Sequence, residues 1–557
     1  MAQTTKVYGL SELRRETFPL AAWIWGHRLR GGQHWIEYML EFLNVLVGFD
    51  YQLGQGLDKN GKYEYRRFTR LGLRRFVFYD EREKSRHPLD DEARAKMIEE
   101  LQKEIQNKST SSVKETLNLI RNVLRSFSAI EEERSWFAKS LFPAHENLLF
   151  WEGLRPRASK YVPGQFDEDI SFNARNFFAR GGEVYYLILS AGTEKELSRR
   201  LSITSRLENL LKNQNSGIGR LAEIVNNAWS VSADNSNEEK GSLGWIPDPD
   251  CQLYQYIAED VAILLSNNLD VLECFDLLAH LICFHLVEYI YHRAHFNSTS
   301  PIHQNEECIE KCRPTILIDA LEESASIIRD TSATLFRQQE YNQEQKIREY
   351  VPQQLNDWAA NILPTQNLAS YLKNEAEDHF STVKITTTDK VNYPKLEKLT
   401  NDFDVGMITQ SDFIREYAAL LISKMFEDFR KNFLSVHRKL AKTIGLVAPR
   451  SGPGARFILD DTLLKALVLS NIEPGNEMVF DEFLERIYHR YGIIIGSNEA
   501  KISGHPALQR INSEFLDRNR FTFLEKMHKA GLVNQYSDAT AMVINNLTAS
   551  QPMGASN

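Results

Sequence analysis

Apolar residues recur at three- and four-residue steps over most of the chain, a spacing that is typical of amphipathic helices. The clearest series lies within residues 412–446, and its apolar positions are Phe413, Tyr417, Leu420, Leu421, Met425, Phe429 and Phe433. Weaker series cover residues 90–140, 171–212, 250–296 and 318–350, and Pro352 and Pro364 punctuate the section that follows. The pattern therefore predicts a mainly α-helical protein.

Segments rich in Pro, Gly and small polar residues divide these series. We interpret residues 230–249 and 447–454 as linkers, and the second reads Val-Ala-Pro-Arg-Ser-Gly-Pro-Gly. Because 557 residues exceed what one hydrophobic core usually covers, we expect several domains. Their predicted order is an aromatic and arginine-rich region at 1–89, helical domains at 90–229 and 250–446, a separately folding module at 455–548 and a disordered tail at 549–557.

The pattern after residue 454 predicts three helices and a terminal hairpin. Helices are expected at 462–470, 480–491 and 512–530, and short strands at 532–536 and 540–544. Asp460 suits the N-cap of the first helix, while Gly492 and Gly531 suit the ends of the other two. This order matches a winged helix-turn-helix, so we predict a C-terminal winged-helix-like (α+β) module.

The third helix of this module carries the first candidate nucleic-acid-binding residues, which are Arg518, Asn519, Arg520, Lys526 and Lys529. In a winged helix, such side chains contact phosphates and base edges of double-stranded DNA. Glu514, Asp517 and Glu525 lie on the same helix and reduce its positive potential. Two interpretations therefore stay open for this helix, namely contact with DNA and docking to a protein.

A second arginine cluster alternates with aromatic residues near the N-terminus and consists of Arg66, Arg67, Arg70, Arg74 and Arg75. Guanidinium groups bind phosphate bidentately and aromatic rings stack on bases, so this cluster is a second candidate nucleic-acid surface. The alternative is a strand pair whose arginines face solvent or pair with nearby carboxylates. The net charge of −9 argues against a non-specific nucleic-acid coat but permits a local basic patch.

Four potential metal ligands fall within the helical series at 250–296, and they are His285, Glu288, His292 and His295. At about 100° per residue, all four project within one arc of the helix. Imidazole and carboxylate groups ligate zinc, but the spacing is not HExxH, so a polar helix face explains the same residues. We find no phosphate-binding loop, dinucleotide fingerprint or nucleophile elbow, and we predict neither a catalytic site nor a cofactor.

The apolar runs are shorter than the roughly 20 residues that span a membrane. The sequence begins without the charged and apolar regions of a secretory signal. Five cysteines do not form a disulfide framework, which suits a reducing compartment. We therefore expect a cytoplasmic protein without a membrane partner.

Three segments together carry a family resemblance, and they are Trp23-Ile-Trp-Gly-His-Arg-Leu-Arg, Arg175-Asn-Phe-Phe-Ala-Arg-Gly-Gly-Glu and the C-terminal module. The layout resembles large accessory proteins of bacterial anti-phage defence islands, in methylation-associated or phosphorothioation-linked restriction systems. The resemblance implies a non-enzymatic, DNA-engaging or scaffold subunit that works beside ATPase, methyltransferase or nuclease partners. The alternatives are a cryptic metal-dependent nuclease component and a winged-helix transcription regulator.

Overall fold

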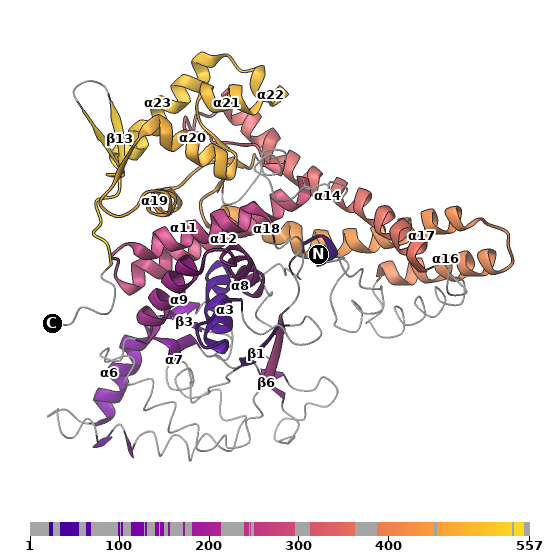
Figure 1. Cartoon of the computed structure of the whole chain (residues 1–557), viewed down its shortest axis with the longest axis horizontal. Helices are drawn as coiled ribbons and strands as arrows, with labels where there is room; N and C mark the ends of the chain where they lie inside the picture. Colours follow the sequence, from indigo (N-terminus) through magenta and orange to yellow (C-terminus); the bar gives the residue numbers. More distant parts are fainter. Residues whose placement is uncertain are drawn as a thin grey trace.

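A computed structural model of the chain shows a helical body from which a long helical arm projects (Figure 1). The structure describes residues 22–25, 34–54, 63–67, 99–100, 102–103, 113–126, 128–130, 140–143, 145–149, 154–155, 171–172, 181–212, 239–243, 246, 250–295, 312–362, 387–449, 454–536 and 540–550. In these ranges the fold is mainly α-helical with short strands, as the pattern predicts.

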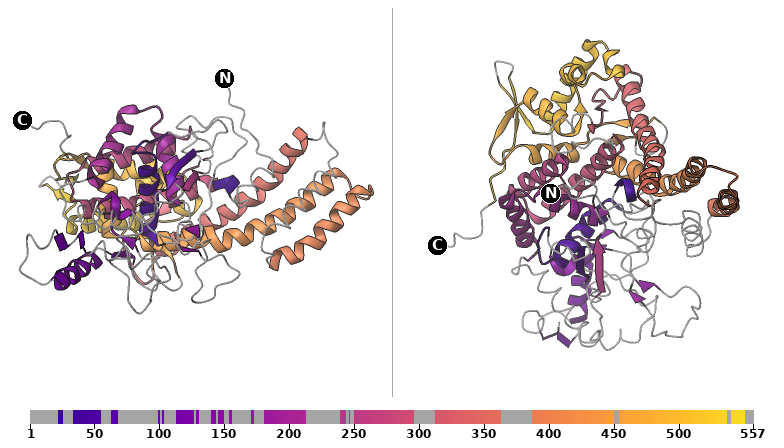
Figure 2. Two further views of the ribbon diagram at one scale, coloured as in Figure 1. Left: turned by 90° about the horizontal axis from the view of Figure 1, so that it is seen from below. Right: turned by 45° about the vertical axis from the view of Figure 1, so that its right-hand side comes forward.

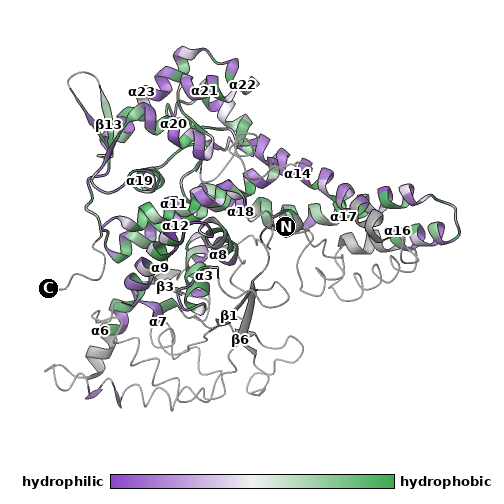
Figure 3. Cartoon of the chain, in the orientation of Figure 1, coloured by the Kyte–Doolittle hydropathy of each residue, from purple (hydrophilic) through white to green (hydrophobic). Residues whose placement is uncertain are grey.

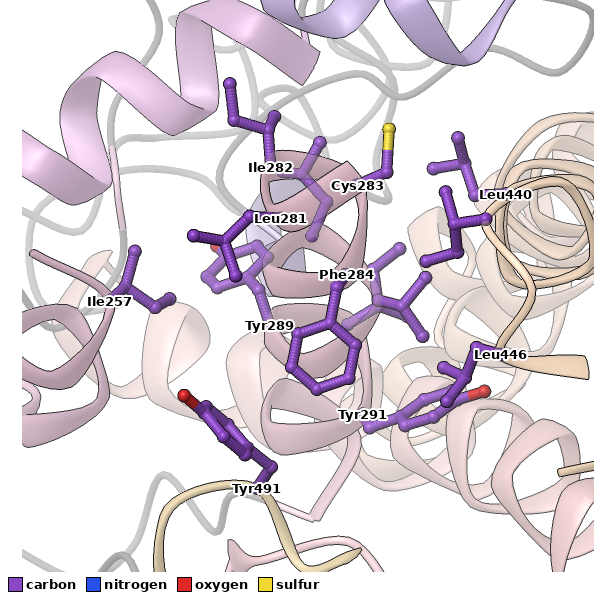
Figure 4. Packing of buried hydrophobic residues seen from close by; sticks show 14 of the residues in the cluster. Ile257, Leu281, Ile282, Cys283, Phe284, Tyr289, Tyr291, Leu440, Leu446 and Tyr491 are labelled. Carbon is purple, nitrogen blue, oxygen red and sulfur yellow. The ribbon is translucent and has the colours of Figure 1, made fainter. Parts of the chain in front are cut away.

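Helix α12 (Val271–His295) lies at the centre of the body, and nearly all its side chains from Cys274 to Ala294 are buried. Helices packed beside it are α3 (Trp35–Gly48), α8 (Gly181–Gly192) and α11 (Gln252–Ser266). Hydrophobic residues are concentrated in these helices (Figure 3). Figure 4 shows Phe284 of α12 beside Tyr491, and Tyr291 beside Leu446, both from later in the chain. The centre of the core is therefore built from segments far apart in sequence.

Smaller elements surround this core. They are α2 (Ala22–Trp25), β1 (Tyr63–Arg67), α6 (Val113–Arg125), β2 (Ser128–Ile130), β3 (Ser140–Leu141), α7 (Glu146–Leu149), β4 (Leu154–Arg155), β5 (Ser171–Phe172), α9 (Leu197–Leu211) and β6 (Glu239–Leu243). Strand β1 pairs antiparallel with β6, β2 with β3, and β4 with β5. Because β6 lies within the predicted linker 230–249, that part of the linker is a paired strand.

The arm consists of α14 (Ile327–Ile362), α16 (Thr387–Asp404) and α17 (Gln410–Asp428), and two views show it leaving the body (Figures 1 and 2). Helix α14 packs on α17, which packs on α16. The predicted break at Pro352 is wrong, because α14 continues through this residue. Pro352 removes one backbone hydrogen bond from α14 without ending it.

The amphipathic series at 412–446 forms a continuous helical run from residue 410 to 443 that contains a π-helical turn. After α17 comes a π-helical turn, η4 (Phe429–Phe433), and then α18 (Leu434–Thr443). The rings of Phe429 and Phe433 pack on Trp25 of α2, with centroid distances of 6.1 and 4.9 Å. The π-helical turn thus coincides with the point where the arm joins the body.

The C-terminal segment contains the elements α19 (Asp461–Asn471), β10 (Glu477–Val479), α20 (Phe480–Tyr491), β11 (Ile493–Ile494), α21 (Ser497–Ser503), α22 (Pro506–Gln509), α23 (Ser513–Lys529), β12 (Val533–Gln535) and β13 (Ala541–Ile544). The strands β10, β13 and β12 form an antiparallel sheet in that order. The predicted N-cap is confirmed, since an Asp460 carboxylate oxygen accepts a hydrogen bond from Leu463 N at 2.8 Å. Gly492 ends α20 in the left-handed conformation, with φ of 70°.

This segment is packed into the rest of the body. Strand β11 pairs in parallel with β7 (Ile316–Leu317), and α19 packs on α11 and α12. Strands β8 (Val447–Ala448) and β9 (Arg456–Phe457) pair across the predicted linker 447–454. One hydrophobic core cluster runs from Ile24 to Val543. The division into separate domains therefore stays a prediction, and the described core is continuous across it.

The predicted disordered tail at 549–557 begins with ordered residues. Ala549 forms a β-bridge with Asn267, and Ser550 N donates to Ser266 O at 2.7 Å. Residues 551–557 lie outside the described ranges. Among the described helices, none combines the length and the apolar character that crossing a bilayer requires.

Candidate interaction face of helix α23 and the buried polar network

The basic side chains predicted to contact DNA from α23 mostly face other parts of the chain. Arg518 forms an ion pair with Glu323, and Arg520 donates from Nε to an Asp481 carboxylate oxygen at 3.0 Å. Lys526 donates to the carbonyl of Leu459 at 2.5 Å and lies 3.7 Å from Asp461. Lys529 is exposed. Most of the positive charge of this helix is therefore balanced within the molecule.

Asn519 is a core residue in this fold. Its Nδ2 donates to the carbonyls of Ile318 and Ile495 at 2.9 Å each, and its Oδ1 accepts from Ala320 N at 2.9 Å. The side chain is fully buried. It joins α23 to the segments after β7 and β11, and it has no exposed atom that reaches a base edge. The prediction that it contacts DNA is contradicted by this burial.

The exposed side of α23 presents an acidic ridge around one aromatic residue. Steps of three and four residues place Glu514, Asp517, Phe521, Glu525 and His528 on the same side, and all five are exposed. The Phe521 ring is 57% exposed at the middle of this set, which we call the α23 ridge. Three carboxylates flank one large apolar group. Such a surface repels phosphate and offers a contact for a protein.

A buried network of polar side chains joins the C-terminal segment to the helical body. Asp260 of α11 lies at its centre and accepts from Tyr491 Oη at 2.7 Å and from His285 Nε2 at 3.1 Å. Its second oxygen accepts from Arg490. Tyr185 of α8 lies 2.9 Å from His285 Nδ1. These contacts fit a neutral His285 that donates from Nε2 and accepts at Nδ1.

The electrostatics of this network match its burial. Desolvation lowers the pKa of His285 below its usual value, although the hydrogen bond to Asp260 opposes the shift. Burial also raises the pKa values of Tyr185 and Tyr491. A Tyr–His–Asp relay is a catalytic arrangement where substrate reaches it, but Tyr185, His285 and Asp260 are 0% exposed. Among the described residues, the network joins α8, α11, α12 and α20.

The four predicted metal ligands are not brought together. His285 bonds to Tyr185 and Asp260, whereas His295 Nδ1 bonds to the carbonyl of Tyr291 at 2.8 Å. Glu288 and His292 are buried, and burial raises the pKa of Glu288 well above its usual value. Within the part of the chain that the structure describes, no three His, Cys, Asp or Glu residues lie close enough to hold an ion.

The N-terminal arginine cluster is described only in part. Arg66 and Arg67 lie in β1, opposite Lys240 and Glu239 of β6. The strand β1 agrees with the second interpretation of the cluster, a strand pair. Its partner strand, β6, comes from a distant segment of the chain. Arg70, Arg74 and Arg75 lie outside the described residues. A nucleic-acid surface at this place stays a prediction.

Sequence reasoning missed the residues that complete the buried network. Asp260, Arg490 and Tyr491 were not singled out, although Asp260 interrupts an apolar series in residues 253–265. A carboxylate among apolar helical positions signals a buried partner. The partner comes from α20, and no local pattern connects these two helices.

The described fold is that of a mainly helical protein with a C-terminal α+β segment fixed to its core. No protein-family model matches the chain, and neither the curated proteins nor the solved structures gave a match. The resemblance to defence-island proteins therefore stays a prediction.

Proposed function

We propose that this chain is a non-catalytic scaffold subunit of a multi-protein complex and that its C-terminal segment is a winged-helix module that docks to a protein. The α23 ridge carries this proposal, because three carboxylates surround the exposed ring of Phe521, while Arg518 and Arg520 form ion pairs with Glu323 and Asp481 of the same chain. Docking to a protein needs such an apolar anchor in a polar rim, whereas DNA needs free cations.

The order of elements supports the winged-helix interpretation. Helix α19, strand β10 and helix α20 come first, and α23 then leads directly into the hairpin β12–β13. The last strand lies between the other two in the sheet. A winged helix has this order, with its hairpin as the wing. The segment β11–α22 is an insertion between the second and third helices in this interpretation.

The complex that we propose is the one that the resemblance implies, a prokaryotic anti-phage defence assembly. Its other subunits would supply ATPase, methyltransferase or nuclease chemistry, and this chain would position them. The buried network around Asp260 supports this role, because it joins the module to the body. A scaffold needs surfaces held at fixed positions.

The experiment compares two exposed aromatic residues. The tagged chain is purified with its natural partners, and Phe521→Ser is expected to lower recovery of one partner about tenfold. Tyr341→Ser is the matched control, because this ring is 54% exposed on α14. Equal recovery with both variants would contradict docking through the ridge. Loss of duplex-DNA binding by Phe521→Ser, with partners retained, would favour the DNA-engaging alternative.

A further inference from the structure

The arm ends in an exposed apolar tip. Residues 401–412 comprise the end of α16, the connection 405–409 and the start of α17, and they lie at the end of the arm farthest from the body (Figures 1 and 2). Met407 is 76% exposed and Val405 is 69% exposed. Both values exceed those of the other large exposed hydrophobic residues among the described ones. Two such side chains on one protruding turn mark an interaction surface.

This tip has a defined conformation that holds the two side chains outward. Gly406, with φ of 71°, donates from its N–H to Phe403 O at 3.1 Å, and Met407 N donates to Asp402 O at 2.8 Å. The rings of Phe403 and Phe413 pack below the turn at 4.9 Å. Phe413 is therefore buried and Phe403 half-buried, while Val405 and Met407 stay exposed.

The start of α17 completes the turn. The Thr409 hydroxyl accepts from Asp412 N at 3.2 Å and donates to an Asp412 carboxylate oxygen at 2.6 Å. These hydrogen bonds cap α17 and lower the pKa of Asp412. The carboxylate is therefore ionised at neutral pH.

The residues of the tip itself carry only negative charge. Residues 401–412 contain Asp402, Asp404 and Asp412 and no lysine or arginine. The nearest cations along the chain are Lys398, one helical turn before Asp402 in α16, and Arg415, which pairs with Asp412 at 3.0 Å. Anionic lipid and nucleic-acid phosphate are repelled by such a surface. A protein pocket with an apolar floor and a rim of lysine or arginine is complementary to it.

We propose that the arm tip inserts Val405 and Met407 into an apolar pocket, rimmed by basic residues, on a partner protein. An unbranched methionine adapts to such a pocket, and the carboxylates of Asp402 and Asp404 pair with its rim. The 36 residues of α14 give the arm a length of about 50 Å, so this contact lies far from α23. The proposal does not rest on the role of the α23 ridge.

The test uses the full-length tagged chain and paired variants. Val405→Asn with Met407→Gln removes the apolar groups, and Asp402→Asn with Asp404→Asn removes charge. Leu197→Asn with Leu201→Gln is the matched control, because these leucines are 63% and 56% exposed on α9. All are expected to melt within about 2 °C of the original chain, since exposed substitutions change stability little.

We expect the recovery of one partner with a basic surface to fall at least tenfold with either pair of tip substitutions. Its recovery with the α9 pair should be unchanged. The purified partner should then bind each tip pair at least tenfold more weakly, and added salt should weaken its binding to the original chain more than to the charge-neutralised pair. Equal recovery with tip and control variants would overturn the proposal. So would a tip variant that only converts a dimer into a monomer in light scattering, because the occupant would then be a second copy.

Discussion

Asp260 is a buried carboxylate that ties the C-terminal segment to the helical body. It is fully buried between His285, Tyr491 and the guanidinium of Arg490. Removing one partner of a buried ion pair leaves the other charge without compensation, which costs about 3–5 kcal/mol. We expect Asp260→Asn to lower the free energy of unfolding by about that amount in urea titrations.

The neighbouring Glu259 provides the control for this substitution. It is 32% exposed and pairs with Arg490 at 3.3 Å. Because exposure weakens an ion pair, Glu259→Gln is expected to change stability by less than about 1 kcal/mol. Equal losses from the two variants would contradict a special role for Asp260.

His437 gives the molecule a pH-dependent stability. Burial lowers its pKa below the usual value in the folded chain, although Glu340 opposes the shift, and Tyr291 Oη lies 3.1 Å from Nδ1. The unfolded chain binds a proton near pH 6.5, and the folded chain binds it only at lower pH. The unfolded state therefore gains protons first, and stability falls as pH falls below about 6.5.

We expect the free energy of unfolding to fall between about pH 7.5 and pH 5 in denaturant titrations. His437→Gln is expected to make this decline shallower. His489, which is 43% exposed, is the control. His489→Gln should leave the slope unchanged. A slope that is the same in all three chains would contradict the account.

At the scale of elements, close helix packing depends on glycines of α8, with Gly182 against α3 and Gly192 against α11. A Cβ atom added to Gly192 would lie 1.9 Å from the carbonyl oxygen of Tyr254 in α11. The backbone of α11 has to move to admit it, so we expect Gly192→Ala to destabilise the chain by about 2–3 kcal/mol, in the upper range of overpacking. Thermal unfolding measures the change.

Gly531→Ala is the control, because it replaces a glycine without disturbing helix packing. Gly531 has φ of 71°, and an added Cβ meets no atom within 4 Å. Gly531→Ala is expected to cost about 1 kcal/mol through its left-handed backbone alone. A larger loss at Gly531 than at Gly192 would show that helix packing is not the limiting feature.

The elements divide into those that local sequence determines and those that it does not. Asp460 and Gly492 fix ends of α19 and α20 through their own backbone and side chains, so their positions could be predicted. Pro352 could not be placed inside a helix, because packing on α17 outweighs its local preference. The pairing of β7 with β11 joins residues more than 150 positions apart, and no short pattern encodes it. The same holds for the candidate site on α23. Which of its side chains are exposed depends on distant segments that contact Arg518 and Asn519, and the sequence of α23 alone does not show this.

At the scale of the whole molecule, the continuous core predicts that residues 455–548 do not fold alone. The isolated fragment lacks β7, so β11 loses its partner strand. It also lacks Ile318, whose carbonyl accepts a hydrogen bond from the side-chain amide of Asn519. It also exposes the face of α19 that packs on α11 and α12. We expect the fragment to lack a cooperative thermal transition in circular dichroism. A sharp transition would instead support the separately folding module that the sequence pattern predicts.

The central claim is that the α23 ridge contacts protein and not DNA, and duplex-DNA binding measured by fluorescence anisotropy at two salt concentrations tests it most directly. Because Arg520 and Lys526 bond within the chain and three carboxylates flank Phe521, we expect Arg518→Ala to leave any binding of the full-length chain to duplex DNA at low salt unchanged. A plot of the logarithm of the binding constant against the logarithm of salt concentration with a slope of about −4 to −5 would show several phosphate contacts. Such binding, if Arg518→Ala weakens it, would contradict the claim.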